Sequence, residues 1–104
     1  MLRALQVDTK DNVAVVAQAV TAGDQVQVND VVFVAKEDIP VGHKMALCDI
    51  AAGEVVIKYG ATIGVASVDI KTGDYVHTQN MIDITTKLCQ EYATEFKKKV
   101  GAVL

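Results

Sequence analysis

A five-residue pattern, Asp-Ile-x-x-Gly, recurs along this chain and constrains its fold more than any other feature. Three copies occupy residues 38–42, 49–53 and 69–73, and a weaker copy, Ala-Val-Thr-Ala-Gly, occupies residues 19–23. In this pattern the aspartate is suited to cap a turn, the isoleucine can be buried, and the glycine supplies the positive φ that tight turns often need. The uneven spacing of the copies argues against a solenoid and favours one compact fold that uses the same turn repeatedly.

Short segments rich in β-branched residues fill the spaces between these turns. Asn29 and Asp30 are typical of a hairpin turn between two of these segments. Many short strands within residues 1–80 favour a small barrel or a folded-over sheet, so the predicted fold class is mainly β. The predicted strands are Ala4–Val7, Val13–Ala17, Gln25–Val28, Val31–Ala35, Lys44–Leu47, Val55–Tyr59, Ile63–Ala66 and Tyr75–Thr78.

The apolar pattern changes to a helical period from residue 81. Asn80 is a suitable N-cap and Gly101 a suitable stop, which predicts one C-terminal amphipathic α-helix from about 81 to 100. The chain then divides into a β domain, 1–80, and a helix with its tail, 81–104. Such a helix must bury its apolar face, which favours self-association or docking onto a partner. The residues on that face are Met81, Ile84, Leu88, Tyr92, Phe96 and Val100.

Composition narrows the class of protein further. The chain has 104 residues, 51% of them hydrophobic, which suits one domain with one core. A net charge of −3 without a basic stripe argues against a nucleic-acid partner. Without a membrane-spanning apolar run or a signal-peptide pattern, we expect a cytoplasmic protein that does not enter the membrane. The two cysteines are expected to be reduced, with Cys48 a small buried hydrophobe.

Few residues suggest chemistry of their own. His43 follows a turn glycine and His77 lies at the junction between the last predicted strand and the predicted helix, so both could project at the same rim of a small barrel. A histidine beside a turn is more often an ordinary surface residue, and two histidines do not complete a metal site. Lys58 ends an apolar strand, where it either extends its ammonium into water or binds a carboxylate. The chain shows no paired acid and base and none of the common catalytic motifs.

Several blocks of this sequence resemble one known family in their order and spacing. The family is the N-terminal domain of altronate and galactarate dehydratases, an SAF-type domain with a β-clip fold. The resemblance covers roughly residues 3–80, and the Gly-His-Lys and Ile-Lys-Tyr-Gly segments are its most specific parts. The matching blocks are residues 11–15, 39–47, 49–60, 63–66 and 73–78, together with Asn80.

The resemblance implies a fold and a function. The fold would be a small SAF-type β-clip, barrel-like domain followed by one C-terminal α-helix. The function would be that of a small subunit or N-terminal domain of a hydro-lyase. Such an enzyme dehydrates a sugar acid of the altronate or galactarate type by α-proton removal and β-elimination. A large catalytic chain, which would hold most of a divalent iron-type metal, would complete the enzyme, so we expect the isolated chain to be inactive.

The resemblance also suggests which side chains face substrate or partner, although no catalytic residue can be assigned. His43 and His77 are the candidate metal ligands. The family commonly reads His-x-His-Asn at the last block, whereas this chain has Gln79 at the third position, and glutamine is a poor ligand for transition metals. Substrate contact or subunit docking is therefore favoured over metal binding. The substrate- or partner-facing candidates are His43, Lys44, Lys58, Tyr59, His77 and Asn80.

Two alternative functions remain open at this stage. A related small subunit belongs to sulfolactate sulfo-lyase, in which sulfite rather than water is eliminated. The chain also fits a non-catalytic carbohydrate-binding or assembly module that keeps the fold. A gene for a large catalytic chain beside this one would favour either lyase over the non-catalytic module.

Overall fold

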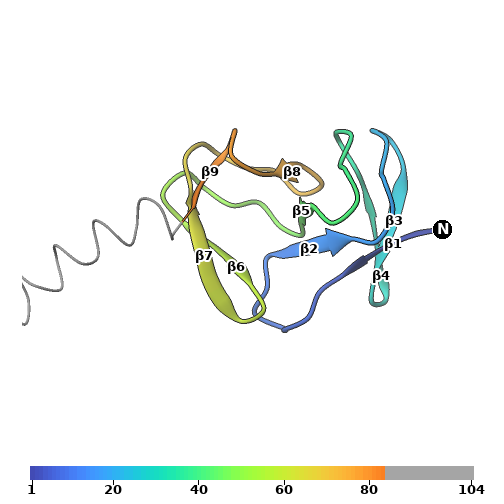
Figure 1. The fold of residues 1–104 in the computed structure, drawn as a ribbon, viewed down its shortest axis with the longest axis horizontal. Helices are drawn as coiled ribbons and strands as arrows, with labels where there is room; N and C mark the ends of the chain where they lie inside the picture. Colours follow the sequence, from blue (N-terminus) through green and yellow to red (C-terminus); the bar gives the residue numbers. More distant parts are fainter. Residues whose placement is uncertain (84–104) are drawn as a thin grey trace, which may run out of the picture.

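The computed structural model describes residues 1–83, and within this range every regular element is a β-strand (Figure 1). None of these residues belongs to a helix of the length and apolar character that crossing a membrane requires. The nine strands are β1 Leu2–Leu5, β2 Val13–Val16, β3 Gln25–Val28, β4 Val31–Val34, β5 Lys44–Ala46, β6 Val55–Lys58, β7 Ala61–Ala66, β8 Tyr75–Val76 and β9 Met81–Asp83.

The strands form two sheets. One has six strands in the order β4-β3-β1-β2-β5-β8, and the other has three in the order β6-β7-β9. Every pairing is antiparallel except that of β1 with β3. The strand β1 joins the two parts of the larger sheet, since Leu2 and Arg3 pair with β3 while Ala4 and Leu5 pair with β2. In Figure 1, β2, β5 and β8 therefore lie between the β1–β3–β4 end and the smaller sheet.

The mainly β part of the predicted fold class is confirmed. Each of the eight predicted segments overlaps one of the strands β1 to β8. The predicted hairpin is also present: Val28 pairs with Val31, and Asn29 between them has a φ of 54°. β-branched residues favour pleated strands, and asparagine tolerates the left-handed conformation, so local sequence and structure agree here.

The prediction of a C-terminal helix, part of the predicted fold class, is wrong for residues 81–83, the part of that helix that the structure describes. Met81–Asp83 form β9, which pairs with β7, instead of beginning a helix. Nor does Asn80 cap a helix, because its Oδ1 accepts the backbone N–H of His77. An apolar pair such as Met81 and Ile82 suits a helix or a strand, and the exposed edge of β7 decides the outcome. The remaining residues of the predicted helix and self-association surface, from 84 onward, lie outside the described residues.

The repeated sequence pattern is also a structural repeat, used as two pairs. We call residues 19–24, 38–43, 49–54 and 69–74 the first to fourth turns. Val20 and Ile39 form one isolated antiparallel bridge, joining the first and second turns, and Ile50 and Ile70 form another, joining the third and fourth. In each bridge both backbone N–H groups donate to the opposite carbonyl at 2.8–2.9 Å. The turn glycines all have positive φ, at 92°, 83°, 89° and 89° for Gly23, Gly42, Gly53 and Gly73.

Carboxylates cap these turns from within and from across each pair. In three turns the acid after the glycine accepts a backbone N–H at 2.8 Å, and the donor–acceptor pairs are Thr21 with Asp24, Ala51 with Glu54, and Lys71 with Asp74. Across the pairs the acceptors are Asp38 for Ala22, Asp69 for Ala52, and Asp49 for Thr72, each at 2.9 Å. The carboxylates of the repeat are therefore structural, and none of them forms a catalytic pair.

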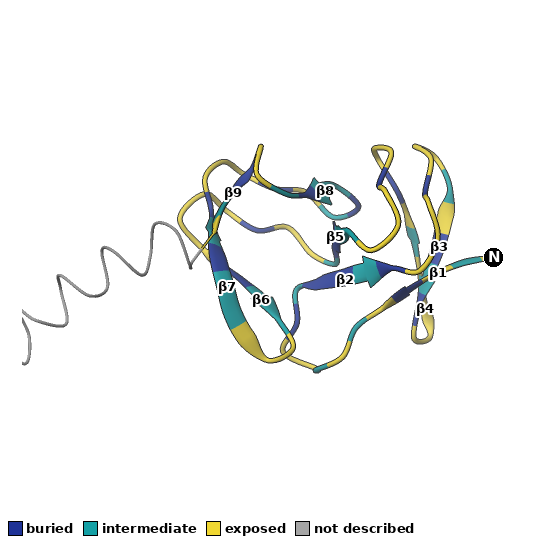
Figure 2. Ribbon diagram, viewed as in Figure 1, coloured by how far each residue is buried: buried dark blue, intermediate teal, exposed yellow. Residues whose placement is uncertain are grey.

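The buried residues form two cores, one around each pair of turns. The first core contains Val20 and Ile39, and the second contains Ile50 and Ile70. Because side chains alternate along a strand, β5 contributes to both: Met45 is buried in the first core, and the next residue, Ala46, in the second. The strand β2 divides in the same way and is almost wholly buried in Figure 2.

Candidate functional site

The antiparallel pairing of β5 and β8 brings the two histidines together. In this pairing Lys44 lies opposite Val76, and Met45 lies opposite Tyr75. His43 immediately precedes β5 and His77 immediately follows β8, so the two residues meet at the same end of the pair. Their ring centroids lie 4.9 Å apart, with the ring planes at 61°. Both side chains are half-buried.

The second turn departs from the other three in a way that frees His43. It has proline at position 40, where the other turns have a residue with a backbone N–H that an acid caps. Proline has no backbone N–H. An acid after Gly42 would therefore find no N–H at position 40 from which to accept a hydrogen bond. The chain places His43 there, and its side chain contacts the rings of Tyr75 and His77 instead of capping its own turn.

Tyr75 completes a cluster of three rings, which we call the ring cluster (His43, Tyr75 and His77). The Tyr75 hydroxyl and Nδ1 of His43 form a hydrogen bond of 2.7 Å. The Tyr75 and His77 rings are nearly parallel, at 7°, with centroids 5.7 Å apart, whereas Tyr75 and His43 meet edge to face. Ring pairs of both geometries are favourable. The cluster therefore holds two imidazoles in fixed orientations at the edge of the larger sheet.

Asn80 holds the backbone of two ring-cluster residues in place. It is buried, with 7% of its surface exposed, and its amide is used on both sides. Its Oδ1 accepts the His77 N–H at 3.0 Å, and its Nδ2 donates to the Tyr75 carbonyl at 2.8 Å. Gln79, the residue that departs from the family pattern, also donates its Nε2 to that carbonyl, at 2.9 Å. Asn80 thus fixes the turn that carries His77 and does not present its side chain to solvent.

Lys44 places positive charge next to His77, and the charges of Lys58 and Asp83 act in turn on Lys44. The pKa of Lys44 lies below its ordinary value, because burial and the nearby charge of Lys58 outweigh the opposite effect of Asp83. The pKa of His77 is also lowered, first by burial and then by Lys44 and His43. His77 is therefore mainly uncharged at neutral pH, next to at least one lysine. This combination suits an anionic ligand better than a cationic one.

Lys58 and Tyr59 lie on the smaller sheet, where β6 ends. The Lys58 ammonium sits 4.8 Å from the centroid of the Tyr59 ring, a cation–π contact. Tyr59 is exposed, and in Figure 1 the tip of the β6–β7 hairpin that carries it points away from β8. The structure thus brings His43, Lys44 and His77 together, with Lys58 close enough to affect Lys44, and leaves Tyr59 apart from the ring cluster.

Asp11 holds the hairpin tip in a strained conformation. Tyr59 and Gly60 have positive φ values of 56° and 72°, and this region is unusual for a bulky residue. The Asp11 carboxylate, 6% exposed, accepts the Gly60 N–H at 2.8 Å and the Asp8 N–H at 3.1 Å. Burial raises the pKa of Asp11, but the hydrogen bonds that its carboxylate accepts from the backbone have the larger combined effect. The pKa therefore lies below the ordinary 3.8. Asp11 thus anchors a hairpin tip on the smaller sheet that carries the exposed Tyr59.

The described residues do not by themselves fit a metal centre. Within residues 1–83, no three side chains of His, Cys, Asp or Glu gather to hold a metal ion. The ring cluster offers two imidazoles, and one nitrogen of His43 is already bonded to Tyr75. A catalytic zinc-type site ordinarily takes three protein ligands and an open position.

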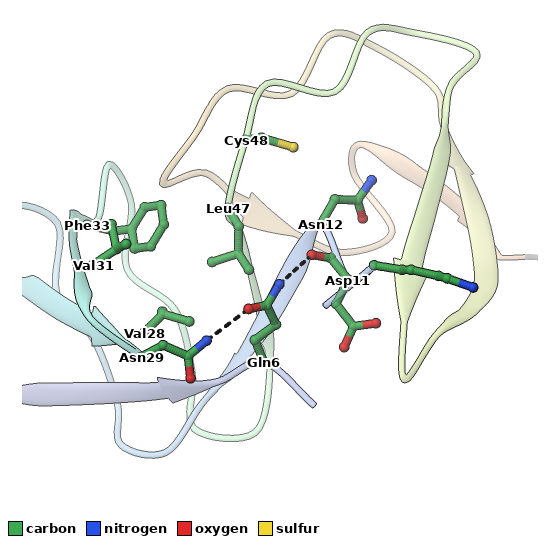
Figure 3. A pocket seen from close by; sticks show the side chains of 10 residues that line it. Gln6, Asp11, Asn12, Val28, Asn29, Val31, Phe33, Leu47 and Cys48 are labelled. Carbon is green, nitrogen blue, oxygen red and sulfur yellow. Dashed lines mark hydrogen bonds between the residues drawn. The ribbon is translucent and has the colours of Figure 1, made fainter. Parts of the chain in front are cut away.

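A pocket of about 400 Å³ lies elsewhere, between β4 and the segments before β2 and after β5 (Figure 3). Phe33 and Leu47 contribute its apolar wall. Its polar side is held together by Gln6, which accepts from the Asn29 amide and donates to the Asp11 carbonyl. Cys48 lines this pocket and is exposed, so the prediction of a buried cysteine is wrong. None of the predicted site residues lines it.

Sequence reasoning did not single out Tyr75. A tyrosine after a turn glycine is an ordinary strand residue, and its contact with His43 joins positions 32 residues apart. One signal was nevertheless present in the sequence. Aligning the four turns shows histidine where the others have Asp24, Glu54 and Asp74, in the same copy that carries Pro40. That substitution marks His43 as the residue whose side chain does not cap its own turn.

Comparison with known proteins identifies the family. The family model described as the altronate/galactarate dehydratase SAF domain matches residues 2–83. The chain is 42% identical over 76 residues to an altronate dehydratase of Escherichia coli (strain K12), and 34% identical over 76 residues to one of Bacillus subtilis (strain 168). Each alignment covers 73% of this chain but 15% of the relative, so the chain spans a small part of those proteins.

A third relative is of similar size to the matched segment. The (2R)-sulfolactate sulfo-lyase subunit alpha of Paracoccus pantotrophus is 48% identical over 52 residues, which cover 50% of this chain and 78% of that subunit. The family match extends over all nine strands, including β5 and β8 with the ring cluster. The chain therefore belongs to the altronate/galactarate dehydratase SAF domain family.

Proposed function

We propose that this chain is the small subunit or N-terminal domain of a hydro-lyase that dehydrates a sugar acid of the altronate or galactarate type. The observation that carries the proposal is the convergence of His43, His77 and Lys44 beside Lys58, in a chain that belongs to this family. These groups form an electropositive surface with imidazole donors and acceptors, which suits the carboxylate of a sugar acid.

The chemistry of β-elimination explains what such a surface contributes. Removal of a proton next to a carboxylate builds negative charge on that group, and nearby cations and N–H donors stabilise it. In this proposal Lys44 and Lys58 supply the positive charge, and the two imidazoles orient the acid. The proton leaves the α-carbon, the hydroxyl leaves the β-carbon, and together they form water. The lowered pKa of His77 keeps that ring uncharged, with one nitrogen free to accept a hydrogen bond from the acid.

The remaining machinery belongs to a large catalytic chain or domain. The altronate dehydratase relatives are far longer than the matched segment, and the sulfolactate relative is named a subunit. Both facts support a role within a larger assembly. The described residues supply two imidazoles, so in this proposal the divalent iron-type metal that the family resemblance implies would be held mainly by the large chain.

A sulfo-lyase of the sulfolactate type is the second candidate. It is favoured by the alpha subunit of Paracoccus pantotrophus, whose length this chain matches over 78%, in contrast to 15% for the dehydratases. The ring cluster and its lysines suit either acid, since both substrates carry a carboxylate beside the carbon that loses its proton. The leaving group alone differs: sulfite in one reaction and water in the other.

The test is to reconstitute the enzyme. The chain is used to isolate its large partner from the native extract, and the two are then co-expressed and supplied with ferrous iron. We expect a keto-deoxy acid from altronate or galactarate, and none from the isolated chain. Sulfite release from (2R)-sulfolactate alone would establish the second candidate instead. A complex inactive on all three acids would contradict both lyase proposals and leave the non-catalytic module.

A matched pair of variants tests the site within that complex. His43→Ala should lower kcat/KM at least tenfold, equivalent to about 1.4 kcal/mol of transition-state stabilisation. Glu54→Ala removes the residue at the same position of the third turn, away from the ring cluster, and should leave kcat/KM nearly unchanged. Equal losses in the two variants would show that His43 acts through the fold and would contradict the proposed site.

A further inference from the structure

The hydrogen bond between Tyr75 and His43 determines which nitrogen of His43 carries the proton. The Tyr75 hydroxyl lies 2.7 Å from Nδ1, a short distance for this kind of bond. A neutral imidazole has one nitrogen that donates and one that accepts, and the partner of one nitrogen sets the state of the other. The direction of this bond therefore fixes what His43 presents at Nε2.

The chemistry of the two groups gives that direction. A phenol hydroxyl loses its proton with a pKa of about 10, and it is a stronger acid than the N–H of a neutral imidazole. The unprotonated imidazole nitrogen is in turn the better acceptor of the two groups. The Tyr75 hydroxyl therefore donates to Nδ1, and the proton of neutral His43 resides on Nε2.

Tyr75 is held in place by contacts of both its backbone and its ring. Its backbone N–H donates to the Glu37 carboxylate at 3.0 Å, and its carbonyl accepts from Asn80 and Gln79. Its ring stacks on His77 and packs against the first core. A side chain restrained in this way loses little further freedom when it bonds to His43, so the bond can bias the tautomer effectively.

We infer that Tyr75 is a positioning residue that holds neutral His43 as its Nε2–H tautomer. This inference rests on the proposed function for its consequence, which is that His43 offers a hydrogen-bond donor to a substrate carboxylate or hydroxyl oxygen. A histidine that binds a metal through Nε2 needs its proton on Nδ1 instead. The inference thus assigns His43 to oxygen recognition and not to metal ligation at Nε2.

NMR of the full chain tests the tautomer without any enzyme activity. Long-range ¹H–¹⁵N correlation of the imidazoles at a pH of about 8.5, well above the ordinary imidazole pKa of about 6.5, distinguishes the two nitrogens. We expect the Nε2–H pattern for His43. In Tyr75→Phe, which keeps the ring but removes the hydroxyl, the preference should weaken while the backbone spectrum stays folded. Tyr59→Phe, the control, should change nothing at His43.

The outcomes separate this inference from the proposed function. An Nδ1–H pattern in the native chain, or an unchanged tautomer in Tyr75→Phe, would overturn the inference whatever the enzyme does. In the assembled enzyme, Tyr75→Phe should raise KM by about twofold, with a smaller effect on kcat, because a smaller fraction of His43 then carries its proton on Nε2. A normal KM in that variant would also overturn it. Inactivity of the native complex on all three acids would instead count against the proposed function.

Discussion

At the scale of single residues, Gly53 and Gly73 show how the same turn tolerates different surroundings. They occupy equivalent positions in the third and fourth turns and share a φ of 89°. A Cβ added to Gly53 would meet no atom within 4 Å, whereas one added to Gly73 would lie 2.4 Å from the Val34 carbonyl oxygen. Backbone cannot move aside as a flexible side chain can, so the two glycines are under different constraints.

Alanine substitutions measure the two constraints separately. Gly53→Ala should lower the free energy of unfolding by about 1–2 kcal/mol, the cost of a left-handed conformation for a residue with a Cβ. Gly73→Ala should lower it by roughly a further 1–3 kcal/mol, because the same strain is joined by a steric clash. Urea denaturation of both variants measures the difference. Equal losses would show that the contact between Gly73 and Val34 relaxes without cost.

The charge of Lys44 acts on His77, and this effect can be isolated. Lys44→Met keeps the side chain's bulk and removes its charge, so the pKa of His77 should rise. It should remain below 6.5, because burial is the larger cause of the lowering. Lys10→Met, in the pocket that none of the ring-cluster residues lines, should leave it unchanged. NMR titration of the His77 ring measures both, and equal shifts in the two variants would contradict the assignment.

The lowered pKa of His77 makes the stability of the fold depend on pH, with a sign that can be derived. The folded chain keeps His77 neutral to a lower pH than the unfolded chain does, so the unfolded state binds more protons below about pH 6.5. The contribution of His77 to stability is therefore present above pH 6.5 and is lost as the pH falls through its lowered folded pKa. Lys44→Met should reduce that loss, as denaturation at several pH values would show.

At the scale of elements, the four turns provide a test built into the chain itself. The second turn lacks both the capping acid and the N–H that the acid would bond. His43→Asp alone would place a carboxylate opposite Pro40, which has no donor. Pro40→Thr with His43→Asp would recreate the pairing of Thr21 with Asp24 in the first turn. The two substitutions should therefore be coupled.

We expect a favourable coupling of about 0.5–1.5 kcal/mol, the net value of one hydrogen bond. The double variant should be more stable than the sum of the two single variants predicts, although the ring cluster has lost one of its two histidines. A double-mutant cycle on the free energy of unfolding gives the coupling directly. A coupling of zero would mean that the second turn has a different backbone requirement from the first.

The elements also show where prediction from sequence succeeds and where it stops. Strands β1 to β8 were predictable because turn glycines and β-branched residues specify them locally. The strand β9 was not, because Met81 and Ile82 fit either period and only the open edge of β7 selects the strand. His43 and His77 were identifiable as neighbours from the turns that precede them. Tyr75 and the support given by Asn80 required the pairing of β5 with β8.

At the scale of the whole molecule, the site lies where the two sheets approach each other. The ring cluster lies on β8 and at the adjoining ends of β5 and β8, at the edge of the larger sheet, while Lys58 and Asp83 come from the smaller one. The balance of charge around Lys44 therefore depends on the relative position of both sheets. Substitutions in either core are expected to disturb it, even where they lie far from His43.

The division of β5 between the two cores implies that the domain unfolds as one cooperative unit. Consecutive residues, Met45 and Ala46, serve opposite halves, so neither half can open while the other keeps its strand. Met45→Ala should cost about 2–5 kcal/mol. In hydrogen exchange, protection should fall by the same factor at Val26 in the first half and Val56 in the second. Faster exchange confined to Val26 would reveal two independent foldons.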